Sequence, residues 1–344
     1  GMGIVVLIVA IFPMLGMGGF QVVKAEMPGP SVDRITPKIT GTAKILWFIY
    51  MGLTVLETAL LMLGGMSFFD ALTHTFGTLA TGGFSPKNLS VGFYQSGYID
   101  AVITVFMLMA GINFNLYFRL LSGKISDLVQ NTELKAYLLI FFIATALMTL
   151  DLSLHGGMTP RSGLRYASFQ AATILTTTGF VTADYSLWPS LSQGVLFILM
   201  FIGGCAGSTG GGVKVVRIVI LLKQGLNEMR RLIHPRGAFT IRINKKGGRK
   251  DIVYAVSGFV FLYAASLLLT TLVVAGAGND IATSISTALV TLGNIGPGFG
   301  KIGPVFNYAF LPEGVKWYLS FIMMAGRLEL FTVLILFMPG FWKK

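Results

Sequence analysis

The sequence predicts an all-α polytopic membrane protein with seven spans and three shorter re-entrant segments. Hydrophobic residues make up 54% of the 344 residues and charged residues only 12%, about half the share found in soluble domains. Apolar stretches long enough to cross a bilayer recur along the chain, and short apolar pieces lie between them. The composition excludes a disordered chain, and the single cysteine, Cys205, excludes a disulfide scaffold.

A helix that crosses a bilayer needs about 20 mostly apolar residues. The stretches that meet this length with few charges are 1–20, 45–64, 98–118, 136–154, 193–222, 252–275 and 316–338. The pieces that are too short to cross, and that we interpret as re-entrant, are 68–80, 165–177 and 280–292.

The positive charges divide unevenly between the two sides of this arrangement. If the short pieces return to the side they came from, the connections 21–44, 119–135 and 223–251 share one side with the C-terminus. Counted with the adjoining helix ends, where Lys214 and Arg217 lie, that side holds twenty of the 26 Lys and Arg residues, and the opposite side holds five. Such a bias places the first side in the cytoplasm. It also explains the net charge of +12 without nucleic-acid binding.

An internal repeat links the short pieces to glycine turns. Three stretches rich in Thr, Ser and small residues each end in a glycine turn, and each follows one span and precedes another. They are FFDALTHTFGTLATGGFS (68–85), RYASFQAATILTTTGFVTAD (165–184) and NDIATSISTALVTLGNIGPGFG (279–300). The chain therefore repeats a unit of span, short helix, glycine turn and span.

Turns of this kind suit a ring of carbonyl groups. Polar backbone at membrane depth is tolerated where it lines a cavity or is buried in protein. Glycine permits positive φ, so successive carbonyls can point at one place and replace the water around a cation. The sequence therefore favours span–pore-helix–span units around a central pore, with three re-entrant pore loops. Glycine turns that only let helices pack are the alternative.

The last span of the third repeat and the last span of the chain contain unusual residues. GGCAGSTGGG (203–212) has six glycines in ten residues, which disfavours a regular helix and predicts a break that lines a water-filled path. A flexible kink that aids packing is the alternative. Arg327 lies within the final span, where a charge marks a functional candidate. It can repel cations and donate hydrogen bonds to the loop, or pair for packing alone. Glu329 is expected to point elsewhere on that helix.

Several motifs resemble one family of transporters. GGCAGSTGGGVKVVRI (203–218), TTTGF (176–180), NIGPGFG (294–300) and MAGRLELFTVLILF (324–337) are similar to the TrkH family, within the Trk/Ktr/HKT superfamily of bacterial, fungal and plant potassium transporters. The stretch 1–20 also resembles this family, in the part that follows its first pore loop. The likeness covers essentially the whole chain.

The resemblance implies a fold of four repeats around one pore. We expect a C-terminal fragment that lacks the first pore loop. The implied divisions are 1–44 (second span of repeat one and a cytoplasmic loop), 45–135 (repeat two), 136–250 (repeat three, with a broken second span) and 251–344 (repeat four).

The resemblance also implies the functional residues. The filter carbonyls fall on Thr81, Gly82, Gly83, Thr177, Thr178, Gly179, Asn294, Ile295 and Gly296. Two adjacent glycines leave the register of repeat two open by one residue. Repeat four departs from the Thr-x-Gly-Phe pattern at Asn294 and Pro297. The loop that blocks the pore falls on Gly203, Gly204, Gly207, Ser208, Thr209, Gly210, Gly211 and Gly212, with Arg327 as part of the gate.

The implied function is the membrane subunit of a potassium uptake system. K+ is the transported ion and no cofactor is expected. The family works as a homodimer in the bacterial inner membrane, with a cytosolic nucleotide-binding regulatory subunit, TrkA. The basic connection 223–251 is the expected contact, and the C-terminus is expected in the cytoplasm. Transport of Na+, or of Na+ and K+, is the nearest alternative. An intramembrane enzyme lacks a catalytic constellation, and a structural scaffold leaves the repeated turns unexplained.

Five other polar residues stand out. Asp70 and His74, four residues apart on the first short helix, are expected to cap the helix and to pair. Asp184 and Asp280 can add negative potential outside the pore. Glu57 lies inside the span 45–64 without a specific explanation.

Overall fold

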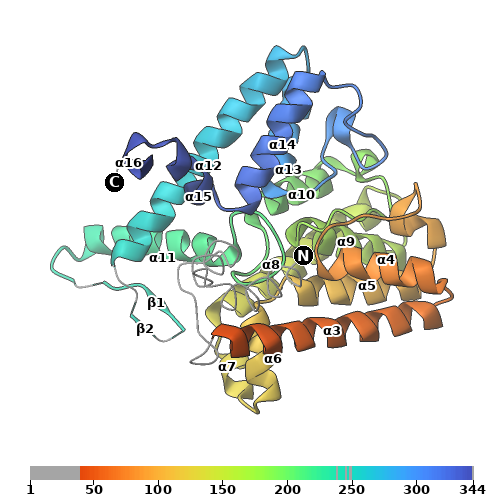
Figure 1. Cartoon of the computed structure of the whole chain (residues 1–344), viewed down its shortest axis with the longest axis horizontal. Coiled ribbons are helices and arrows are strands. Elements are labelled where there is room, and N and C mark those ends of the chain that lie inside the picture. Colours follow the sequence, from red (N-terminus) through yellow and green to blue (C-terminus); the bar gives the residue numbers. More distant parts are fainter. Residues whose placement is uncertain (1–38, 238, 245, 248–249, 343–344) are drawn as a thin grey trace.

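The computed structural model (Figure 1) describes all of the chain except residues 1–38, 238, 245, 248–249 and 343–344. The expected first span, 1–20, therefore lies outside the described residues. The described part is helical apart from one small antiparallel hairpin, in which β1 (Arg242–Ile243) pairs with β2 (Lys246–Gly247).

Three long helices are the first spans of the three described repeats. They are α3 (Ile39–Leu63), α8 (Thr132–Leu154) and α12 (Lys250–Gly276). Each contains a continuous apolar stretch long enough to cross a bilayer. Asn131 begins α8, because its side chain accepts a hydrogen bond from the N–H of Leu134.

Each first span packs against a short helix of its own repeat. The short helices are α4 (Phe68–Leu79), α9 (Pro160–Leu175) and α13 (Ile281–Gly293), close to the expected re-entrant pieces. A side-chain oxygen caps the N-terminus of each. The capping residues are Ser67, Thr159 and Asp280.

The second spans of repeats two and four bend sharply. In repeat two, α5 (Gly97–Ala110) and α6 (Phe114–Leu121) meet at 94°. In repeat four, α14 (Glu313–Arg327) is followed at 117° by α15 (Leu330–Leu334) and the 3-10 turn η5 (Ile335–Phe337). The sequence predicts a break only in repeat three, so these two bends are additional findings.

The second span of repeat three is interrupted by a long loop. Helix α10 (Ser190–Ile202) ends at Gly203, and α11 (Val215–Ile233) begins after Lys214. The connection 203–214, here named the glycine loop, crosses the middle of the molecule below α13 and α14 (Figure 1). Gly203, Gly207 and Gly212 have φ of 71–84°, which only glycine adopts without strain.

The remaining elements are short. They are η2 (Ser90–Tyr94), α7 (Ile125–Val129), η3 (Tyr185–Leu187), η4 (Gly300–Ile302) and α16 (Pro339–Trp342).

The outer surface of the helices is strongly apolar. The main buried cluster contains residues of α5, α8 and α10 and of the short helices α4, α9 and α13. On α12, by contrast, the exposed side chains include Phe261, Leu268 and Leu272, each 63–73% exposed. Apolar exposure along a whole helix indicates contact with lipid. The described part is therefore that of a polytopic membrane protein.

Candidate functional site

Each short helix runs directly into a three-residue turn. Turn two is 81–83, turn three is 177–179 and turn four is 294–296. In all three, the first residue has a left-handed φ between 50° and 58°, and the third is a glycine with φ between 66° and 104°. This shared backbone aligns Gly83 with Gly179, so the register of repeat two is the one that begins at Thr81. Asn294 adopts the conformation of the two threonines, since asparagine tolerates left-handed φ.

The three turns touch one another in order. A Cβ added to Gly83 would lie 2.0 Å from the carbonyl oxygen of Thr178. A Cβ added to Gly179 would lie 2.2 Å from the carbonyl oxygen of Ile295. Glycine is therefore needed at both positions, because a side chain would collide with the next turn and because φ is positive. The structure brings the nine residues expected in the filter together in three adjacent turns.

The amide groups of the turns are bonded back to their own helices. The middle N–H of each turn donates to a carbonyl five residues earlier, over 2.8–2.9 Å. The pairs are Gly82–Gly77, Thr178–Thr173 and Ile295–Val290. Among the described residues, the first two carbonyls of each turn accept no hydrogen bond. The turns thus present open acceptors on a backbone whose first two N–H groups are already bonded in every turn.

The base of the glycine loop is anchored to repeats two and three. The N–H of Cys205 donates to the carbonyl of Gly111, where α5 ends, over 2.9 Å. The N–H of Ala206 donates to the carboxylate of Glu133, in the first turn of α8, over 2.6 Å. The carbonyls freed by the bend of repeat two therefore serve as anchors for the loop of repeat three.

The tip of the glycine loop, residues 209–211, lies against the turns. The hydroxyl of Thr81 donates to the carbonyl of Thr209 over 2.8 Å. The N–H of Gly211 donates to the hydroxyl oxygen of Thr177 over 2.6 Å. A Cβ added to Gly211 would lie 2.3 Å from the carbonyl oxygen of Gly293. The loop is therefore directly adjacent to the first residues of turns two and three.

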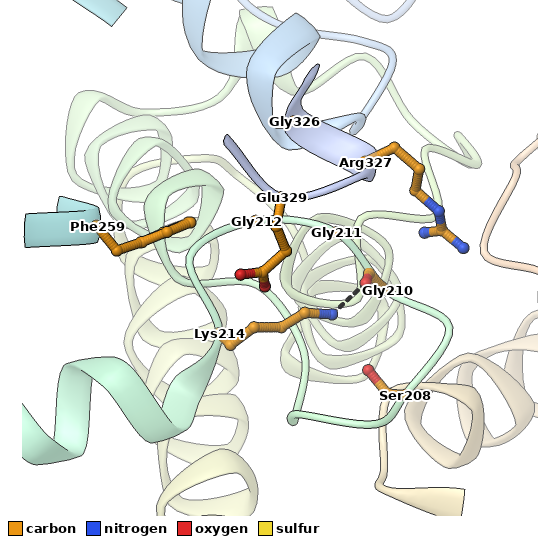
Figure 2. Close-up of a pocket in the computed structure, with 9 residues that line it drawn as sticks. All are labelled: Ser208, Gly210, Gly211, Gly212, Lys214, Phe259, Gly326, Arg327 and Glu329. Carbon is orange, nitrogen blue, oxygen red and sulfur yellow. Dashed lines mark hydrogen bonds between the residues drawn. The ribbon is translucent and has the colours of Figure 1, made fainter. Parts of the chain in front are cut away.

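Two cationic side chains hold the carbonyls of this tip. Arg327, at the end of α14, donates to the carbonyl of Thr209 over 2.6 Å. The ammonium group of Lys214 donates to the carbonyl of Gly210, and only 2% of Lys214 is exposed. Figure 2 shows the two side chains reaching the tip from different elements. They line a cavity of about 20 Å³, room for about one water molecule. The charge bias groups Lys214 with the basic residues at the cytoplasmic helix ends, and the structure shows in addition that its side chain is buried.

An ion pair joins α11, which follows the glycine loop, to the segment that follows α14. Arg217 contacts both carboxylate oxygens of Glu329 over 2.5 and 2.7 Å, and its guanidinium lies 3.8 Å from the ring centre of Phe259. The expectation that Glu329 points elsewhere on a continuing helix is wrong. Helix α14 ends at Arg327, and Glu329 has φ 63°, so its side chain turns back toward Lys214 (Figure 2).

The other polar residues have local roles. Asp184 caps η3, and Asp280 caps α13. The hydroxyl and backbone N–H of Thr283 hold the pKa of Asp280 below its usual value. Glu57 is fully buried on α3, and its carboxylate has no hydrogen-bond partner among the described residues. In the same part of the chain, no group of three His, Cys, Asp or Glu residues is placed to hold a metal.

Comparisons with known proteins agree on one family. The profile of the TrkH family, described as cation transport protein, matches residues 1–344. The chain is 42% identical to the Trk system potassium uptake protein TrkH of Halomonas elongata, and 40% identical to that of Escherichia coli K12. Each alignment covers 100% of this chain and 71% of the relative. The crystal structure of the potassium transporter TrkH from Vibrio parahaemolyticus has a TM-score of 0.85 and 38% identity, over 99% of this chain and 70% of that one.

Proposed function

The chain belongs to the TrkH family of cation transport proteins, and we propose that it is the membrane subunit of a potassium uptake system. Its relatives are named for potassium uptake and not for an enzymatic reaction. One observation carries the proposal: three turns with the same backbone conformation touch one another, and their leading carbonyls accept no hydrogen bond from the described residues.

In this proposal the turns form the potassium filter. The carbonyls of Thr81, Thr177 and Asn294, and those of the next residue in each turn, replace the water of a dehydrated K+. The N–H groups bonded back to each short helix hold these carbonyls at fixed spacing. The C-terminal ends of the short helices add negative potential at the same place. The ion then moves inward along the membrane potential.

The glycine loop is the proposed gate. Its tip lies next to the first residues of the turns, and the positive charges of Arg327 and Lys214 reach that tip. A cation that leaves the filter therefore meets both a steric block and electrostatic repulsion. Opening requires the tip carbonyls to lose these donors. The gate residues are those expected from the sequence, with Lys214 added.

The wider assembly belongs to the same proposal. We assign the repeats to 45–135, 136–250 and 251–344, with 1–44 completing repeat one. The protein acts as a homodimer in the bacterial inner membrane with its C-terminus in the cytoplasm. The basic segment 223–251 contacts the regulatory subunit TrkA. Support comes from the end of α11, where Arg230 and Arg231 occupy the last turn, and from the basic bias of that side of the chain.

Ion flux into proteoliposomes of the full-length protein tests the function. We expect uptake of 86Rb+ that unlabelled K+ suppresses and that an equal concentration of Na+ leaves largely unchanged. Equal suppression by both ions would replace the proposal with Na+ or mixed Na+ and K+ transport. No flux of either ion, with the regulatory subunit present, would overturn it in favour of a non-conducting protein.

A further inference from the structure

Behind every turn, a buried polar side chain of the short helix is bonded to the segment that leaves the turn. The donors and acceptors differ among the three repeats, and the helix residue lies seven residues before turns two and three and eight residues before turn four. The pairs are His74 with Ser85 at 2.9 Å, Gln170 with Thr182 and Ala183 at 3.5 Å each, and Ser286 with the N–H of Phe299 at 2.7 Å. The segment after each turn is thus bonded to the helix that precedes it.

In repeat two, the bond between His74 and Ser85 is part of a chain of hydrogen bonds in which each polar group has a partner. The Nδ1 atom of His74 lies 2.7 Å from the carbonyl oxygen of Asp70. Because a carbonyl only accepts, Nδ1 carries the proton, and Nε2 of the neutral ring accepts from the hydroxyl of Ser85. The same hydroxyl oxygen accepts the N–H of Lys87 over 3.1 Å. Both ring nitrogens and the hydroxyl are therefore satisfied, and His74 is fully buried.

His74 also touches the neighbouring repeat. Its ring stacks on that of Phe180, the residue after turn three, with 5.6 Å between the ring centres and 29° between the ring planes. The ring of Tyr94 packs edge-on against it, with 5.6 Å between the ring centres. The charged groups that face it are Asp70 and Lys87, which form an ion pair of 3.2 Å. One side chain therefore contacts the segment after turn two and the segment after turn three. It is placed to keep the two turns in a fixed relation.

We propose that His74 is a positioning residue for ion selectivity, which acts by tying Ser85 to α4 and so fixing turn two beside turn three. The inference rests on the proposed potassium filter. Turn two is held from one end by its N–H bonds to Gly77 and from the other by the His74–Ser85 bond. Without the second restraint the turn can adjust to a smaller ion, and discrimination between K+ and Na+ falls.

Repeat three supplies a conservative replacement for this residue. Gln170 is fully buried and lies seven residues before turn three, as His74 lies seven residues before turn two. An amide in this position thus reaches the segment after a turn in the same molecule. His74→Gln should therefore retain much of the tie, whereas His74→Phe keeps the aromatic stack and removes both hydrogen bonds.

The test measures K+ and Na+ flux through full-length variants in proteoliposomes at equal protein amounts. We expect His74→Phe and Ser85→Ala each to lower the ratio of K+ to Na+ flux about tenfold, equal to about 1.4 kcal/mol. The double variant should lose no more than the larger single loss, because both changes break one bond. His74→Gln should recover most of the ratio. Thr73→Ala, whose hydroxyl bonds only within α4, is the control.

Distinct results separate this inference from the proposed function. An unchanged ratio in Ser85→Ala and in His74→Phe, with both fluxes reduced together, would show that His74 is structural and overturn the inference. If His74→Phe does not fold, the ratio in Ser85→Ala decides, since Ser85 is partly exposed. A wild-type protein that conducts K+ and Na+ equally would refute the filter itself.

Discussion

The turns and the tip of the glycine loop are both short glycine-rich segments, yet they are held in different ways. Each turn is held by backbone bonds to a helix of its own repeat, over 2.8–2.9 Å at its middle residue. The carbonyls of the loop tip are held by side chains: Thr81 and Arg327 come from distant elements, and Lys214 is the last residue of the loop itself. The turns are therefore fixed by backbone bonds within their own repeats, whereas the loop tip is fixed by side-chain donors.

This difference separates selection from gating. A backbone bond to the preceding helix is lost only when that helix unwinds, so the spacing of the turn carbonyls is preserved. A side-chain donor can leave by a rotamer change or by a small movement of its helix. Changes in the turns should therefore alter which ion passes, and changes around the tip should alter how much passes. The following variants test that division.

Gly179→Asp should abolish selective potassium uptake. The residue has φ 90°, and an added Cβ would lie 2.2 Å from the carbonyl oxygen of Ile295, so any side chain displaces turn four from turn three. The measurement is growth of an uptake-deficient bacterium at low K+. Gly194→Ala is the control, because an added Cβ in α10 meets no atom within 4 Å. Normal growth of the Gly179 variant would show that turn three is not part of the filter.

Arg327→Ala should raise flux about a hundredfold and leave the ratio of K+ to Na+ unchanged. A cation that passes a fixed positive charge at about 5 Å meets roughly 3 kcal/mol of repulsion at an effective dielectric of 20, which is about a hundredfold in rate. Rb+ flux with and without the regulatory partner measures the effect.

Arg327→Gln separates the two contributions of this side chain, since an amide donates to Thr209 without the charge. An intermediate rise is expected. Unchanged or lower flux in both variants, at normal expression, would place the gate elsewhere.

Lys214→Met should raise flux by about tenfold. The variant removes one charged donor from the carbonyl of Gly210, and a hydrogen bond to a charged group contributes roughly 1.5–3 kcal/mol. Arg327 and Thr81 still hold the carbonyl of Thr209, so the effect should be smaller than for Arg327. The same Rb+ assay applies, with Lys135→Met, an exposed residue of α8, as the control. A change in the K+ to Na+ ratio with no change in total flux would contradict the division between turns and tip.

The periodic features of the sequence led to the fold. Apolar length predicted α3, α8 and α12, and the repeated glycine turns located α4, α9 and α13 to within a few residues. Thr-x-Gly at 177–179 pointed to the shared backbone because glycine two residues after a small polar residue suits two positive φ values. The hydrogen bond from Arg327 to the loop was also among the expectations, and the structure contains it.

The misses arise where a helix ends without a local signal. Nothing in LELFTVL marks the turn at Glu329, because apolar residues continue on both sides. The bend is set by tertiary contacts, chiefly the Arg217–Glu329 pair. The burial of Lys214 could not be predicted for a related reason: a lysine next to a helix start is expected at the membrane interface unless the preceding loop folds back over it. The hydrogen bond from Lys214 to Gly210 could not be predicted either, because its acceptor is a backbone carbonyl, which every residue has.

The contact between neighbouring repeats has a direction along the chain. Phe180, which follows turn three, is fully buried and lies against Gly77 and His74 of α4. Pro297, which follows turn four, lies beside Gly179. In both cases the later segment settles on a surface provided by the earlier one. Domains form from the N-terminal end during synthesis, so each receiving surface exists before its occupant leaves the ribosome. The turns can therefore assemble in the order of translation, because each repeat that has folded provides the surface on which the next repeat packs.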